Sequence, residues 1–443
     1  MRKLFFIIFT SVWVCSAVSA ENRFPLEYEF LISAELSELD GLTLGDEPAE
    51  KRLEIEEYEF EFDLLYQIDD HWYAFFAGQL GDEAETIEPA GLKEEDLSGF
   101  ERKQIGIGVE FCDEIISDFS IVRVEFISIG EWWLWWDEEL DAIKLESSYG
   151  DFEALIGLAE EQARENTDQD FIDPEVDGIQ RIIASLGWQI ADSQSLHFYY
   201  LDQQDDSSSF IDGETIDTDK EDEEDADLTW TGISYLGEFE DDGMGELEVE
   251  LHYARVSGDE TVYEFEAMPG GTSDVDGDPV KNRVAGSARG FLINWSPAPA
   301  DDWSFILGRA QGEREYRQNG LQGDSEVFGE LFQPELANLV IETIGVEYEI
   351  NEYVEIGLLA FGYEQDRAID ELRDATIDFE LNGTSKDIGE EIDLVLTVEA
   401  FDGMELSLIA AEFKAGKAYN IEPSRNYDGE TSQFWKFELE YEF

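Results

Sequence analysis

The stretch that decides the fold is residues 434–443, which read FWKFELEYEF. Its apolar side chains recur at every second position and share one face: Trp435, Phe437, Leu439, Tyr441 and Phe443. The other face carries Lys436, Glu438, Glu440 and Glu442, and only Phe434 breaks the pattern. A period of two is typical of a β-strand with one apolar face. The stretch therefore predicts a barrel strand with lipid on one side and a polar lumen on the other, and an aromatic residue closes it.

Three earlier segments repeat this alternation, around residues 57–68, 246–253 and 391–399. A soluble β-sandwich would show the same period, so alternation alone does not establish a membrane protein. In a barrel, a charge on the lipid face costs a few kcal/mol near the bilayer midplane, which favours the lumen for every acidic row. The predicted acidic lining residues are Glu57, Glu59, Glu61, Asp63, Glu246, Glu248, Glu250, Glu391, Asp393, Glu399, Glu438 and Glu440.

Connection lengths favour the barrel over the sandwich. Short polar links near 69–70, 113–117, 150, 191–193, 241–243, 299–301, 351–352 and 402–403 alternate with long ones. The long connections lie near 37–51, 81–99, 130–139, 160–176, 203–226, 257–281, 312–338, 365–386 and 415–430. Short periplasmic turns and long outer loops are typical of outer-membrane barrels. The fold class predicted is all-β: one antiparallel up-and-down transmembrane barrel of 18 strands, with 16 as the alternative.

The N-terminus predicts export. Arg2 and Lys3 precede the apolar stretch 4–14, and Val18-Ser19-Ala20 forms a small-residue cleavage site. Residues 1–20 are therefore expected to be a signal peptide, and residues 21–443 one barrel domain in the outer membrane of a Gram-negative bacterium. Only Cys112 remains after cleavage, so no internal disulfide can form. No later stretch approaches eighteen apolar residues, which argues against a helical span.

The charge of the chain restricts its partners. There are 108 acidic and 27 basic residues, a formal net charge of −81. Such a field repels nucleic acid and attracts cations. Adaptation to a salty habitat and selectivity of the channel for cations explain the acidity equally well. The partners expected are outer-membrane lipid, lipopolysaccharide and the outer-membrane assembly machinery.

Two regions resemble the alginate export family of outer-membrane channels. One is Trp135-Trp136-Asp137 with 139–145 and the strand 152–161. The other is 389–396, reading GEEIDLVL, with 404–408 and 413–416 after a turn. The resemblance implies an eighteen-stranded barrel that carries an anionic polysaccharide across the outer membrane, with periplasmic polysaccharide-export components as partners.

One strand departs from this resemblance. Family members carry an arginine-rich strand before the double tryptophan, and here that strand is 122–129, reading VRVEFISI. Without gaps, the family's arginine positions fall on Glu125, Ile127 and Ile129. An acidic lumen that lacks these cations is an electrostatic barrier to a polyanion, so alginate itself is a doubtful substrate.

Other side chains could serve at a constriction or a sugar site. Basic lining candidates are Arg123, Lys144, Arg181, Arg289 and Arg309, and the alternative is that each neutralises a neighbouring acid. Trp132, Trp133, Trp135 and Trp136 could stack on sugars or belong to an interfacial aromatic girdle.

One acidic loop and the three histidines bear on a metal site and on an enzyme site. Asp274, Asp276 and Asp278 resemble the start of a calcium loop, but Ala285 stands at position twelve, so a full EF-hand is excluded and an incidental acidic turn is favoured. No cofactor is otherwise expected. The three histidines, His71, His197 and His252, stand near no GxSxG, HExxH or P-loop motif, so the chain is not expected to be an enzyme.

The sequence thus predicts an outer-membrane channel of the alginate export type, which passes or exports a hydrophilic solute or exopolysaccharide passively through an acidic, water-filled lumen. A cation-preferring porin that lost polysaccharide export is the first alternative. A structural or adhesive barrel plugged by its own loops is the second.

Overall fold

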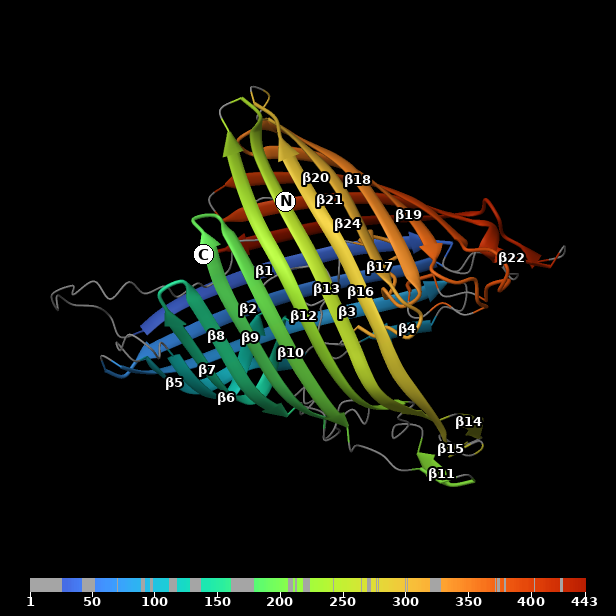
Figure 1. Ribbon diagram of the computed structural model, residues 1–443, viewed down its shortest axis with the longest axis horizontal. Helices are drawn as coiled ribbons and strands as arrows, with labels where there is room; N and C mark the ends of the chain where they lie inside the picture. Colours follow the sequence, from blue (N-terminus) through green and yellow to red (C-terminus); the bar gives the residue numbers. More distant parts are fainter. Residues whose placement is uncertain are drawn as a thin grey trace.

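The computed structural model is a single barrel (Figure 1). It describes residues 26–41, 52–69, 71–88, 92–95, 99–110, 118–127, 137–160, 179–205, 210–211, 213–217, 224–241, 243–263, 265–268, 272–275, 277, 279–298, 300, 302–318, 328–370, 372, 375–377, 380–401, 403–422 and 425–443. The predicted signal peptide lies outside these residues.

Eighteen long strands form the wall. They are β1 (Leu26–Asp40), β2 (Arg52–Gln67), β3 (Trp72–Glu88), β5 (Gly99–Glu110), β6 (Asp118–Ile127), β7 (Asp137–Tyr149), β8 (Phe152–Glu160), β9 (Ile179–Ala191), β10 (Gln194–Asp205), β12 (Glu224–Asp241), β13 (Gly245–Val262), β16 (Val280–Ser296), β17 (Trp303–Gly312), β18 (Leu339–Asn351), β19 (Val354–Gln365), β20 (Asp387–Phe401), β21 (Met404–Ala415) and β24 (Thr431–Glu442).

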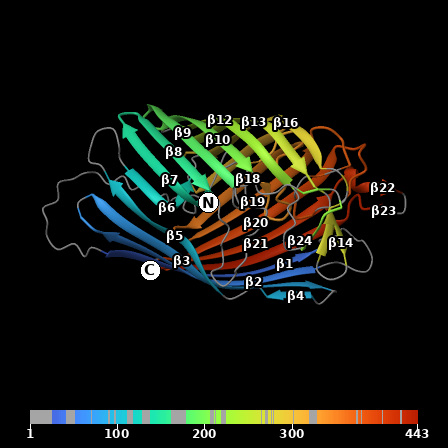
Figure 2. The same ribbon diagram turned by 90° about the horizontal axis from the view of Figure 1, so that it is seen from below.

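Short elements lie in the long connections. They are β4 (Leu92–Glu95), β11 (Thr215–Asp217), β14 (Phe265–Met268), β15 (Thr272–Val275), the 3-10 turn Lys417–Tyr419, β22 (Asn420–Glu422) and β23 (Arg425–Asn426). Figures 1 and 2 place β14 and β22 at the end of the barrel away from the C-terminus. None of the described helices has the length and apolarity needed to cross a membrane.

Antiparallel pairing closes the barrel. Each wall strand pairs with its neighbour in sequence, and β1 pairs with both β2 and β24, with Leu31 opposite Glu442 and Asp40 opposite Gln433. The sheet therefore has no free edge, which satisfies the backbone groups inside a bilayer. The prediction of an all-β barrel with 18 strands is confirmed.

Side chains alternate between an apolar outer face and a mixed inner face. On β20, Ile392 is 56% exposed on the outer face, whereas the preceding residue, Glu391, is fully buried on the inner face. On β13, Leu251 and Tyr253 point outward and His252 points inward. The outer face is therefore a band of exposed aliphatic and aromatic side chains suited to lipid.

Several strands extend into segments predicted as loops. β3 continues to Glu88 and β13 to Val262, beyond the loop starts expected near 81 and 257. Above the apolar band both faces of a strand are polar, so the alternation that marks a strand in the sequence disappears there. The cross-strand ladder nevertheless continues, with Glu224 opposite Val262.

The turn between β2 and β3 shows how a short link is fixed. The Asp69 carboxylate accepts hydrogen bonds from the backbone N–H groups of His71 and Trp72, each at 2.9 Å. These bonds favour the charged form and hold the pKa of Asp69 below its usual value. An aspartate at this position therefore stabilises the tight reversal between the two strands.

Candidate functional site: the inner wall

A row of carboxylates crosses five neighbouring strands on the inner face. Ser33 on β1 lies opposite Glu59 and Glu440, and Glu405 lies opposite both Glu440 and Glu399. The row therefore runs from β2 through β1, β24 and β21 to β20. The Ser33 hydroxyl donates to Glu59 at 3.3 Å. Carboxylates directly opposite one another repel, so this row attracts cations.

A second row lies two residues further along each strand, nearer the end of the barrel that carries the long connections. Glu35 stands opposite both Glu57 and Glu438, and Ser407, Thr397 and Glu355 continue the row. The Lys436 ammonium lies 3.1 Å from Glu35 and 3.4 Å from Glu438. One lysine against these acids leaves the second row negative as well.

These two rows combine predicted and unpredicted residues. Glu57, Glu59, Glu399, Glu438 and Glu440 come from the predicted set, and the fold adds Glu35, Glu355 and Glu405. The added acids also alternate with apolar neighbours, and this pattern in the sequence could have identified them as inner-face residues. Which acids stand opposite one another depends on strand register, which cannot be read from a single sequence.

The remaining predicted acids of β2 and β13 also lie on the inner face. Glu61 falls opposite Leu31 and Asp63 opposite Glu29. On the other side of the barrel, Glu246 and Glu248 stand opposite Glu240 and Glu238, and Glu250 opposite Leu236.

Glu391 and Asp393 have different surroundings, because a connecting segment covers them. The backbone N–H groups of Leu331 and Phe332 donate to the Glu391 carboxylate at 2.9 and 3.1 Å. Glu330 N–H donates to Asp393 at 3.1 Å. The Tyr363 hydroxyl lies 3.0 Å from Glu391 and donates to the Phe328 carbonyl at 2.6 Å. Both carboxylates therefore hold the connection between β17 and β18 against the inner wall.

We call the described residues of 313–338, 366–386 and 416–430 the inner segments. Their apolar side chains pack against wall residues of β19 and β21: Phe332 stacks on Phe413 with ring centroids 4.6 Å apart, and Tyr363 lies 4.8 Å from Phe332. All three rings are buried. Backbone hydrogen bonds join the segments, from Thr376 to Phe332 and from Asn382 to Ala418. The described residues of these three connections thus fold into a common core within the mouth of the barrel.

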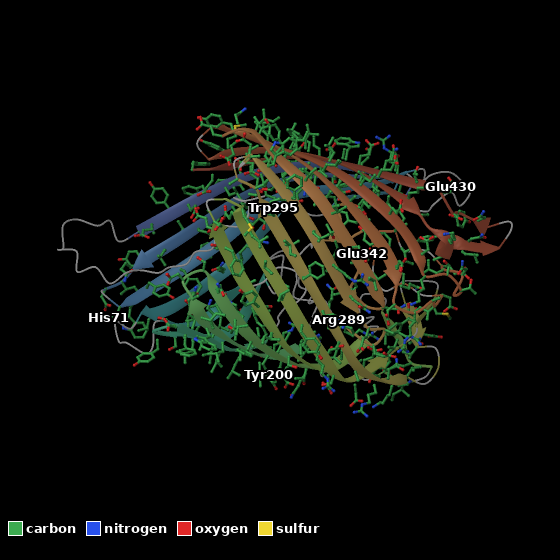
Figure 3. All side chains as sticks on the ribbon, turned by 45° about the horizontal axis from the view of Figure 1, so that its top comes forward. His71, Tyr200, Arg289, Trp295, Glu342 and Glu430 are labelled. Atoms are coloured by element: carbon green, nitrogen blue, oxygen red, sulfur yellow. The ribbon has the colours of Figure 1, made fainter. Side chains whose placement is uncertain are left out.

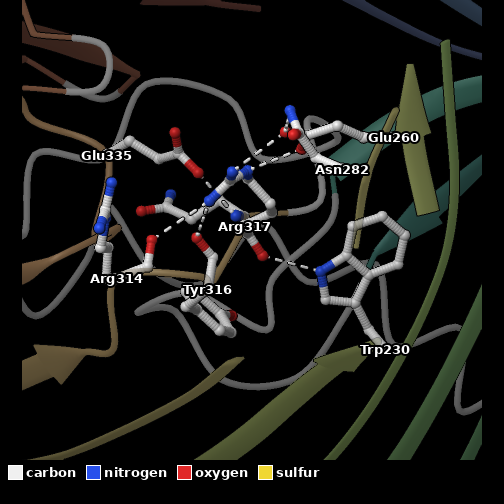
Figure 4. A network of polar contacts seen from close by, with 8 residues as sticks. Trp230, Glu260, Asn282, Arg314, Tyr316, Arg317 and Glu335 are labelled. Carbon is white, nitrogen blue, oxygen red and sulfur yellow. Dashed lines mark hydrogen bonds and ion pairs between the residues drawn. The ribbon is translucent and has the colours of Figure 1, made fainter. Parts of the chain in front are cut away.

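An ion pair fixes the first inner segment to β13, two strands away from β17 (Figure 4). The guanidinium of Arg317 donates from Nε and Nη2 to the two oxygens of buried Glu260, at 3.1 and 3.3 Å. The indole of Trp230 on β12 donates to the Arg317 carbonyl at 2.8 Å. Sequence patterns could not pair residues so far apart in the chain.

A serine–histidine–glutamate group lies within the inner wall. Ser234 Oγ lies 2.6 Å from His252 Nδ1, and His252 Nε2 lies 3.0 Å from Glu250. His197 stands opposite Ser234 across the strand pair β10–β12. Ser234 is fully buried, so its hydroxyl is not presented to a substrate. The group satisfies polar atoms between strands.

The predicted basic residues separate into two sets. Arg181 is buried on the inner face and donates to Gln203 at 3.2 Å, and Lys144 lies 3.1 Å from Glu146. Arg289 instead lies on the outer face with Trp295 (Figure 3). Arg309 shares the outer face with Leu307, so the prediction that the two arginines line the lumen is wrong. Without the register, the polar residues above the apolar band could not be distinguished from lumen residues.

Three predictions fall wholly or partly outside the described residues. Arg123 lies opposite Ile105 and Asp141 in the β-ladder, but its side chain is not described. The four tryptophans Trp132, Trp133, Trp135 and Trp136 lie outside the described residues, as do Asp276 and Asp278. Asp274 accepts a hydrogen bond from the Thr215 hydroxyl at 2.6 Å. In the described part of the chain, no three His, Cys, Asp or Glu side chains are grouped to hold a metal.

Comparison with known proteins agrees with the barrel and assigns a family. Residues 166–432 match the family model described as alginate export. The chain belongs to the alginate export family. The family and the closed barrel are those of outer-membrane channels. No curated protein sequence matches the chain significantly.

Solved structures share the fold of this family member at low sequence identity. Acinetobacter baumannii OccAB4 superposes with a TM-score of 0.60 at 10% identity, over 95% of this chain and 99% of that one. Acinetobacter baumannii OccAB2 gives 0.58 at 11% identity, over 94% and 98%. Pseudomonas aeruginosa OpdQ gives 0.57 at 10% identity, again over 94% and 98%. The likeness extends over the whole barrel.

Proposed function

We propose that this member of the alginate export family is a passive channel for small hydrophilic cations and cationic solutes. The observation that carries the proposal is the pair of carboxylate rows on β2, β1, β24, β21 and β20, in which Lys436 pairs with Glu35 and Glu438. Facing carboxylates in a wet lumen concentrate cations and repel anions. An anionic polysaccharide would have to pass the same rows.

The inner segments support a limit on solute size. They fill the space against β18–β21 with buried side chains such as Phe332, Leu336 and Tyr419. A polymer in transit would have to displace this core or pass along the β1–β2 side. A narrowed passage with acidic walls suits small cations better than a polyuronate.

A loop-closed structural barrel is the second candidate function. The interlocked inner segments favour it, because their hydrogen bonds and stacked rings hold them inside the mouth. In that case the acidic rows would lie in a lumen that conducts nothing.

Swelling of proteoliposomes separates these functions. We expect lysine to enter several-fold faster than glutamate, a solute of similar size and opposite charge, with uronate oligomers excluded. Empty liposomes and liposomes with heat-denatured protein serve as controls. Faster entry of glutamate or of uronate oligomers would contradict the proposal, and absence of swelling with every solute would favour the closed barrel.

A further inference from the structure

Three arginines, which we call the arginine sector, lie on the outer face at the edge of the apolar band nearest the long connections. On β7, β8, β10, β12 and β18–β21, the first charged outer residue beyond the apolar run is an acid: Asp141, Glu160, Asp202, Asp227, Glu342, Glu364, Glu390 and Glu412. On three adjacent strands, β13, β16 and β17, it is instead Arg255, Arg289 and Arg309. Arg283 and Lys281 lie further along β16 on the same face.

The register makes the three arginines neighbours. Arg289 lies opposite Tyr253, two residues from Arg255, and Arg309 lies opposite Phe291, two residues from Arg289. Each step is thus a diagonal cross-strand neighbour, with a spacing of about 7–8 Å. Three long cationic side chains therefore project from one continuous patch of the outer wall.

Most of these cations form no ion pair with a described acid, although Asp259 lies opposite Arg283 in the ladder. Arg289 donates to the Gln311 amide at 3.1 Å, and Arg309 pairs with Glu342. No acid of the described residues forms an ion pair with Arg255, Arg283 or Lys281. By contrast, Arg52, Lys144, Arg317, Lys417 and Lys436 each have a carboxylate partner. In a chain with 108 acids, cations without an ion-pair partner that are grouped on the adjacent strands β13 and β16 indicate an external anion.

The residues next to the sector fit the rest of a lipid. Along the same strands toward the short turns, Leu251, Phe305 and Leu307 are 47%, 42% and 50% exposed on the outer face. Acyl chains would contact these side chains, while guanidinium groups bind phosphate in bidentate fashion at the upper edge of the band. Long arginine side chains reach from the edge of an apolar surface toward headgroups.

We propose that Arg255, Arg289 and Arg309 form a docking site for the phosphates of a phosphorylated glycolipid in the outer leaflet. The site lies on the outside of the barrel and does not depend on what the lumen passes. The bound glycolipid would neutralise this cationic sector and fix the barrel's position among its lipids.

The test compares the purified protein with the triple variant Arg255→Gln/Arg289→Gln/Arg309→Gln. The probes are rough lipopolysaccharide with phosphorylated lipid A, the same glycolipid after dephosphorylation, and inorganic phosphate, with binding followed by native mass spectrometry and thermal shift. The variant Arg52→Gln removes one outer-face arginine that has carboxylate partners, and heat-modified gel mobility confirms that each barrel is folded.

We expect the wild type to retain the phosphorylated glycolipid, and binding to weaken about tenfold for each guanidinium removed. Arg52→Gln should bind as the wild type does. Equal binding by the folded triple variant, or equal binding of the dephosphorylated glycolipid, would overturn the proposal. Inorganic phosphate bound as tightly as the glycolipid would assign the site to free phosphate and overturn the lipid partner.

Discussion

Replacing Glu391 with alanine is expected to release the connection between β17 and β18 from the inner wall. The substitution leaves the N–H groups of Leu331 and Phe332, both buried, without their acceptor. A buried donor without a partner costs about 1–3 kcal/mol. A total of about 3 kcal/mol shifts the equilibrium between packed and released segments about a hundredfold. We expect larger and noisier single-channel conductance and faster limited proteolysis within residues 313–338.

Glu390→Gln is the matched control for this variant. Glu390 is the neighbouring residue on β20 and is exposed on the outer face, so its neutralisation removes one charge without touching the inner segments. Conductance and proteolysis of Glu391→Ala that match this control would show that the carboxylate does not hold the segment.

The triple variant Glu59→Gln/Glu405→Gln/Glu440→Gln is expected to lose most of the channel's preference for cations. The three residues belong to one row, with Glu405 directly opposite Glu440. A carboxylate about 8 Å from an ion in water contributes about 0.5 kcal/mol before salt screening. At about 0.1 M salt, screening roughly halves this contribution. The three charges then stabilise potassium by about 0.75 kcal/mol and destabilise chloride by as much, a difference of about 1.5 kcal/mol, so the potassium-to-chloride permeability ratio should fall about tenfold. Bilayer recordings under a salt gradient measure this ratio.

The matched control for the row neutralises three outer-face acids, Glu364→Gln/Glu390→Gln/Glu412→Gln. All three are exposed on β19, β20 and β21, so the net charge changes equally but the lumen does not. A selectivity loss of the same size in both variants would mean that the overall charge, and not the row, sets the preference.

Much of the barrel could be predicted from the period of two. Each wall strand must satisfy lipid on one side, so alternation such as that of residues 435–443 survives in the sequence, and the loop rhythm then gives eighteen strands. The extracellular strand ends were missed because no lipid enforces alternation there. β13 consequently continues to Val262 through a segment expected to be a loop.

The site was less predictable because it depends on contacts between distant residues. The inward direction of Glu59 and Glu440 follows from alternation, but their place in one row follows from register. Glu391 looks like any lining acid in the sequence, and only the fold of residues 328–338 shows that it holds a segment. Arg289 and Arg309 were misplaced because a polar residue at the end of an apolar run fits either face.

The reversal potential of the wild-type channel in a planar bilayer under a potassium chloride gradient tests the central claim most directly. With carboxylate rows facing a wet lumen, we predict a reversal potential close to the potassium equilibrium potential. A reversal potential near zero or toward the chloride equilibrium potential would contradict the account.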